Sequence, residues 1–114
     1  MRLNITARHF KLSESLKKYV ENEVRRLKKY YDGIIDIEVI LQWEKSRRVV
    51  EIKTLVYGTV LAAQDQSEDM KKAINSTVDK LERQIMKYKE RLKSFEHEKF
   101  IDETAPVEDK TKSL

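Results

Sequence analysis

The sequence contains no cysteine, and this absence excludes several kinds of protein at once. Without thiols the chain cannot form disulfides, use a thiolate nucleophile or ligate zinc through cysteine. Only two histidines are present, His9 and His97, and neither stands at metal-ligand spacing from another ligand. The sequence therefore predicts neither a metal site nor a cofactor.

Glycine and proline are almost as scarce, with two glycines and one proline in 114 residues. A glycine-rich phosphate loop is therefore absent, and no Ser-His-Asp set is suggested. The carboxylates of Glu68-Asp69 are explained by the positive N-terminus of a helix, and those of Asp36 and Glu38 by the solvent face of a strand. We expect no enzyme and no small-molecule substrate.

Long apolar runs are also missing, since none approaches the ~20 residues that a membrane helix needs. The first residues, Met-Arg-Leu-Asn-Ile-Thr, are typical of a strand and not of a signal peptide. We expect a cytoplasmic protein with no membrane partner, and 114 residues predict one domain.

Charge, by contrast, is abundant and unevenly distributed. Charged residues make up 39% of the chain. Residues 1–94 hold 21 Lys and Arg against 14 Asp and Glu, a net charge of +7, whereas residues 95–114 hold 3 against 6, a net charge of −3. A basic body followed by an acidic end indicates different roles for the two parts.

Three segments alternate between apolar and polar residues and are expected to be strands: 1–6, 34–43 and 48–57. Residues 60–63, which include small side chains, are expected to form a short fourth strand. In the segment 34–43, the odd-numbered residues from Ile35 to Trp43 are expected to face the core. With a helix on either side of the last three strands, the order is β-α-β-β-β-α. A right-handed crossover then pairs the first strand in parallel, and we predict an α+β domain whose four-stranded sheet carries both helices on one face.

The first helix is expected to begin near Glu14, capped by Ser13, and to end at Gly33 in the left-handed conformation. Its apolar stripe consists of Leu16, Val20, Val24 and Leu27. On the far side lie Lys18, Arg25 and Lys29, with Arg26 at the edge of that patch.

The second helix is expected to follow a cap at Asp65 or Ser67 and to run to about Phe95. Its apolar stripe consists of Ile74, Val78, Leu81, Ile85, Tyr88, Leu92 and Phe95, spaced alternately four and three apart. At ~100° per residue, the opposite side carries Lys72, Lys80, Arg83, Lys87 and Arg91.

If the helices lie side by side, their cations merge into one basic plate, which Arg8 and His9 would extend. Such a surface suits a polyanion lined with phosphates. The simpler alternative is that lysine and arginine only keep an exposed helix face hydrated. Since Asp79, Glu82 and Glu90 fall to one flank of the second helix, we favour nucleic-acid binding, although spacing does not choose between RNA and DNA.

From Glu96 onward the helical periodicity fails, and the segment is acidic and contains Pro106. Residues 1–95 are therefore expected to form the domain, and residues 96–114 an acidic, disordered tail.

Two segments resemble a known family. Leu3-Asn-Ile-Thr-Ala-Arg-His-Phe10, and Ser67-Glu-Asp-Met-Lys-Lys-Ala-Ile-Asn75 leading into Asp79-Lys-Leu-Glu-Arg-Gln-Ile-Met-Lys-Tyr-Lys89, resemble the ribosome hibernation-promoting factors, also called ribosome-associated inhibitors or sigma-54 modulation proteins. The match covers about residues 1–95. The predicted element order agrees with that family's fold, which is similar to double-stranded RNA-binding domains.

The resemblance implies a short-form factor that binds the 16S rRNA of the small ribosomal subunit, in the channel used by messenger RNA and tRNAs, and inhibits translation in stressed or stationary cells. It implies rRNA contacts at Lys80, Arg83 and Lys87 and at Arg8, Arg26 and Lys29. With the other cations of the two stripes, the expected rRNA-binding set is Arg8, Lys18, Arg25, Arg26, Lys29, Lys80, Arg83, Lys87 and Arg91.

Long members of the family carry a second, ribosome-pairing domain, and we expect nothing in this sequence to fold into one. A truncated long form stays open as an alternative to a short form, as do both promoting and opposing ribosome pairing. We expect a monomer. Two other functions compete with the predicted ribosome binding. One is a general double-stranded RNA-binding module without ribosome specificity. The other is an enzyme acting on RNA, which would need a general acid or base beside the basic face, and the sequence offers none.

Overall fold

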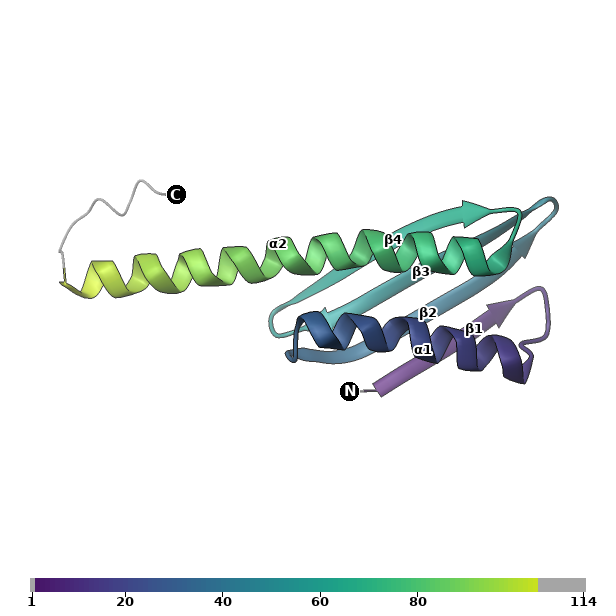
Figure 1. Ribbon diagram of the computed structural model, residues 1–114, viewed down its shortest axis with the longest axis horizontal. Coiled ribbons are helices and arrows are strands. Elements are labelled where there is room, and N and C mark those ends of the chain that lie inside the picture. Colours follow the sequence, from purple (N-terminus) through teal and green to yellow (C-terminus); the bar gives the residue numbers. More distant parts are fainter. Residues whose placement is uncertain (1, 105–114) are drawn as a thin grey trace.

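A computed structural model describes residues 2–104, and its elements follow the predicted order (Figure 1). The elements are β1 (Arg2–Arg8), α1 (Glu14–Tyr30), β2 (Ile34–Glu44), β3 (Arg47–Val56), β4 (Thr59–Ser67) and α2 (Met70–Thr104). The sheet has the order β1-β2-β3-β4, with β1 parallel to β2 and the other pairs antiparallel. The predicted α+β class and the parallel first pairing are confirmed.

Both helices cover the same face of the sheet, as predicted, and Figure 1 shows them running side by side across the strands. The apolar stripes of the two helices and the inner face of the sheet form one buried cluster. Val24 of α1, Ile52 of β3 and Leu81 of α2 are all fully buried within it. Within residues 2–104, the other face of the sheet carries no helix (Figure 1), so the helix layer presents an outer surface of its own.

At the start of β2, the residue that faces the core differs from the prediction. Ile35 is 47% exposed, whereas its neighbour Ile34 is 5% exposed and belongs to the core. The pairing of β2 with β3 shifts register between Ile34 and Asp36. One extra residue at such a bulge reverses the facing of the residues before it, and so the prediction that Ile35 faces the core is wrong.

Trp43 lies at the rim of the core near the β2–β3 hairpin and is 44% exposed. Its ring stacks on Phe10, with the two centroids 5.2 Å apart. The guanidinium of Arg48 lies 4.1 Å from the centroid of the Trp43 ring. These contacts explain the residue as one that closes the end of the core.

The left-handed conformation predicted for Gly33 is wrong, because the positive φ falls on Gly58, at +83°. Gly33 is favoured for a different reason: a Cβ atom there would collide with the outer end of the Tyr31 ring and force the ring to move. The helix itself ends as Tyr31 turns extended, with φ at −158°. A close approach between ring and backbone explains this glycine.

The N-cap residue of α1 agrees with the prediction, and that of α2 does not. Ser13 caps α1 as expected, its side chain accepting a hydrogen bond from the backbone N–H of Leu16 at 3.1 Å. The corresponding role at α2 belongs to Asp69, whose carboxylate accepts from the N–H of Lys71 at 3.1 Å. Asp65 and Ser67, the predicted caps, lie in β4, which extends beyond the predicted 60–63.

The second helix also runs further than predicted, to Thr104 instead of about Phe95. The predicted boundary between domain and tail therefore lies inside α2. Residues 96–104 contain no glycine or proline, and the first strong helix breaker is Pro106. The periodicity fails there because an apolar stripe is no longer needed, not because the helix ends. The predicted disorder of 105–114 concerns residues outside those that the structure describes.

Candidate nucleic-acid interface

Two stripes of cations lie on the outer surface of the helix layer. The α1 stripe consists of Lys18, Arg25 and Lys29, and the α2 stripe of Lys80, Arg83, Lys87 and Arg91. All seven residues are exposed. Each stripe occupies the side of its helix away from the buried positions, because a helix turns ~100° per residue. The predicted outward orientation of these cations is confirmed.

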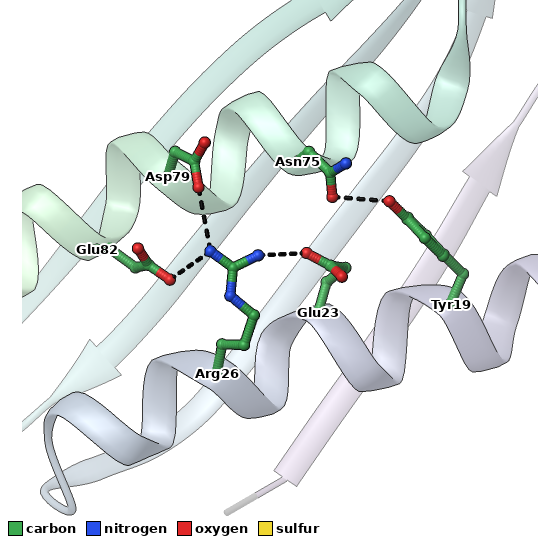
Figure 2. A network of polar contacts seen from close by, with 6 residues as sticks. All are labelled: Tyr19, Glu23, Arg26, Asn75, Asp79 and Glu82. Atoms are coloured by element: carbon green, nitrogen blue, oxygen red, sulfur yellow. Dashed lines mark hydrogen bonds and ion pairs between the residues drawn. The ribbon is translucent and has the colours of Figure 1, made fainter.

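Between the stripes lies an inter-helix cluster made of Glu23, Arg26, Asp79 and Glu82 (Figure 2). One terminal nitrogen of Arg26 donates to the carboxylate of Glu23 at 2.6 Å. The other donates to Glu82 at 2.7 Å and to Asp79 at 3.1 Å. The side chains of Glu23 and Glu82 are only 18% and 14% exposed, so this cluster is well packed and joins α1 to α2.

The neighbours of Arg26 stabilise its charged form. Burial alone would lower the pKa of Arg26, but the hydrogen bond to Asp79 and the charges of Glu82 and Glu23 outweigh that effect and raise it. Three carboxylates and one guanidinium leave the inter-helix cluster with a formal charge of −2. The two stripes therefore do not merge into the single basic plate that we expected.

Nearby, Tyr19 donates its hydroxyl proton to the side-chain oxygen of Asn75 at 2.7 Å, which gives the helices a second polar link (Figure 2). Periodicity indicates which side of a helix a residue occupies but not which residue faces it from the next helix. The sequence signal for the inter-helix cluster was that Asp79 and Glu82 lie together on one flank of the second helix, beside the α2 stripe.

Arg8 lies apart from the stripes. Along β1 exposed residues alternate with half-buried ones, and Leu3 and Ile5 pack against the core. Arg8 has the opposite parity and pairs with Gln42 of β2, so it belongs to the sheet face without helices. His9, exposed and with φ at 69°, follows directly. The expected extension of the basic plate by Arg8 is wrong, and the extension by His9 stays a prediction.

Lys80 combines exposure with contacts to its own protein. Its ammonium donates to the carbonyl oxygen of Gln64 at 3.3 Å and lies 3.5 Å from the carboxylate of Asp65. One turn later Gln84 donates to the carbonyl oxygen of Ala62 at 2.6 Å. These bonds attach α2 to the outer edge of β4, a role that the sequence pattern did not reveal.

In the part of the chain that the structure describes, no group of three or more His, Cys, Asp or Glu side chains could hold a metal ion. Among the same residues, no helix combines the length and the apolar character that a membrane crossing requires.

Comparison with known proteins agrees with this architecture. The family model described as "Sigma 54 modulation protein / S30EA ribosomal protein" matches residues 3–93. The chain belongs to this family. This match confirms the resemblance to the sigma 54 modulation family that the two sequence segments indicated. The matched region contains both cation stripes and the inter-helix cluster, and it ends before the last part of α2.

Among curated members of the sigma 54 modulation family, the ribosome hibernation promoting factor of Azotobacter vinelandii is 35% identical over 91 residues, covering 80% of this chain and 85% of the relative. The factor of the same name from Escherichia coli K12 is 34% identical over 93 residues, covering 82% and 98%.

Solved structures show the same fold. A ribosomal subunit interface protein from Coxiella burnetii superposes with a TM-score of 0.74 and 29% identity, over 78% of this chain and 98% of the other. The N-terminal domain of Protein Y from Thermus thermophilus has a TM-score of 0.69 and 28% identity, over 76% and 94%.

Proposed function

We propose that this protein is a ribosome hibernation factor, in keeping with the name that its curated relatives carry. The observation that carries the proposal is the outer surface of the helix layer. It presents two parallel stripes of exposed cations on a rigid, well-packed scaffold. Clustered cations on one face are the electrostatic footprint of a nucleic-acid-binding protein.

The partner we propose is the 16S rRNA of the small ribosomal subunit, in the channel that messenger RNA and tRNAs use. The cations of the two stripes pair with phosphates and release counterions, which supplies affinity. Specificity comes from shape, since the target is one folded RNA surface and no base needs to be read. The mechanism is occlusion: the bound domain fills the channel and translation stops under stress or in stationary phase.

Of the nine expected contacts, seven belong to the two stripes and form the proposed rRNA-binding face. Arg8 lies on the other face of the sheet and would reach a different part of the subunit. This function needs no catalytic step, no cofactor and no second copy of the chain. It places the protein in the cytoplasm.

Sedimentation through sucrose gradients tests the proposal. We expect the protein to migrate with small subunits, and an excess of messenger RNA and tRNA to displace it. A general double-stranded RNA-binding module would instead bind a plain RNA duplex as tightly as the subunit and would resist such displacement. That result would replace the proposed function by the alternative.

A further inference from the structure

Arg25 and Arg26 are neighbours in sequence but have different surroundings. Arg25 is exposed, and its guanidinium donates to the neutral side-chain oxygen of Asn22 at 2.8 Å. Arg26 is half-buried and donates to three carboxylates, two of them at 2.6 and 2.7 Å. Within the described part of the chain, no carboxylate pairs with Arg25, whereas Arg26 has three such partners, although both residues were expected to bind rRNA.

Binding a phosphate would require Arg26 to leave its partners. Glu23 and Glu82 are largely shielded from water, with 18% and 14% of their side chains exposed. Carboxylates in such positions are strongly unfavourable once their counter-charge is removed. The geometry therefore opposes a phosphate contact by Arg26 and favours the contacts it already makes.

The same carboxylates lie between α1 and α2, the two helices that carry the stripes of the proposed rRNA-binding face (Figure 2). At physiological salt, charges influence one another over a Debye length of ~8 Å. Arg25 of the α1 stripe adjoins Arg26 in sequence, and Arg83 of the α2 stripe adjoins Glu82, so we infer that a phosphate held at either position experiences the inter-helix cluster. Its formal charge is −2 with Arg26 present and would be −3 without it.

We propose that Arg26 is a charge-masking positioning residue of the rRNA-binding face and does not contact phosphate. It neutralises part of the negative charge between the stripes and orients Glu23, Asp79 and Glu82 toward itself instead of toward RNA. The remaining negative charge repels RNA phosphates from the space between the helices, so the phosphates bind along the two stripes separately. This inference rests on the proposed function, because it assumes that this face binds RNA.

A double-substitution cycle tests the proposal. Arg26→Ala is made in the wild-type chain and in a background carrying Glu23→Gln, Asp79→Asn and Glu82→Gln. Affinity for isolated small subunits is measured at several salt concentrations. Arg25→Ala, made in both backgrounds, is the matched control for a true phosphate contact, and thermal melts verify folding of every variant.

If Arg26 masks the carboxylates, Arg26→Ala lowers affinity about tenfold in the wild-type chain but less than about threefold in the neutralised background, and the loss in the wild-type chain diminishes as salt screens the unmasked carboxylates. Arg25→Ala lowers affinity equally in both backgrounds and makes the log–log salt slope shallower by about one unit. A loss from Arg26→Ala that is as large in the neutralised background as in wild type overturns the proposal, as does the absence of any loss in wild type.

Should Arg26→Ala fail to fold, the neutralised background with and without Arg26→Gln decides, because neither chain carries an unpaired carboxylate in the cluster. We expect these two chains to bind within about threefold of each other, and a tenfold lower affinity without Arg26 overturns the proposal. Failure of the proposed function is recognised separately, since the wild-type chain would then not bind small subunits. In that case, the same substitution cycle measured with an RNA duplex at low salt still tests whether Arg26 masks the carboxylates.

Discussion

At the scale of single residues, the cations of this domain differ in the partners that surround them. Arg83 and Lys87 are exposed on the helix layer, whereas Arg26 and Lys80 bind carboxylates and carbonyl groups of their own protein. A cation that is already engaged gives up those partners when it binds a phosphate. Arg83 and Lys87 are therefore the positions where substitution separates RNA binding from stability.

Replacing Arg83 and Lys87 together by alanine should weaken binding to small subunits substantially and leave the melting temperature unchanged. Each phosphate contact contributes about one unit to the log–log slope of affinity against salt, so the slope should become shallower by about two units. Titrations at several salt concentrations measure this. Lys53→Ala, which removes an exposed cation from the opposite sheet face, is the control and should bind as wild type does. Undiminished affinity in the folded double variant would contradict the proposed face.

A second residue-scale prediction concerns pH. The hydrogen bond from Arg2, and then its charge, hold the pKa of Asp36 below its ordinary value despite some desolvation. A carboxyl with a lowered folded pKa stabilises the fold above its unfolded pKa, and this contribution disappears as the pH falls through the folded pKa. Arg2→Ala should therefore raise the pKa of Asp36, as followed by NMR titration. It should also destabilise the fold slightly at neutral pH but not in acid. An equal destabilisation at both pH values would show that the ion pair is not its cause.

At the scale of elements, periodicity predicted the order and the facing of strands and helices because burial acts on every residue of a stripe. Periodicity did not predict features that depend on a single contact between residues. The bulge at Ile35 depends on the register with β3, and the preference for Gly33 depends on where the Tyr31 ring lies. The end of α2 was missed because helix formation there does not depend on an apolar stripe.

Leu81→Ala tests the assignment of the buried face of α2. Leu81 is fully buried, and truncating such a side chain costs ~2–5 kcal/mol of unfolding free energy. Any loss of ribosome binding should follow the loss of folded protein. Leu92→Ala is the matched comparison, because Leu92 continues the same stripe but is only half-buried, and it should cost clearly less. Equal costs in denaturant titrations would show that the core extends further along α2 than the structure indicates.

At the scale of the whole molecule, the long axis is set by α2, which continues beyond the sheet (Figure 1). The principal extents are 58 × 25 × 17 Å. Residues 95–104 belong to this projecting helix and hold four acidic residues against one lysine, a net charge of −3, whereas residues 105–114 hold two of each sign and are neutral. The acidic excess that the sequence placed in a tail thus belongs to the end of α2.

This location predicts how the acidic end affects association with the ribosome. At ~1.5 Å per residue, Glu96 lies about 8 Å along the helix from Arg91, the last cation of the α2 stripe, and Glu103 lies about 18 Å from it. All but the nearest of these acidic positions are beyond the Debye length of ~8 Å at physiological salt, and all are within the ~30 Å that applies at 0.01 M. Deleting 95–114 should therefore change the association rate with small subunits by less than about twofold at physiological salt and accelerate it at low salt. Deleting only 105–114 should have no effect at either concentration, since that segment is neutral. Stopped-flow measurements decide, and a large acceleration at physiological salt would mean that the acidic end reaches the cation stripes.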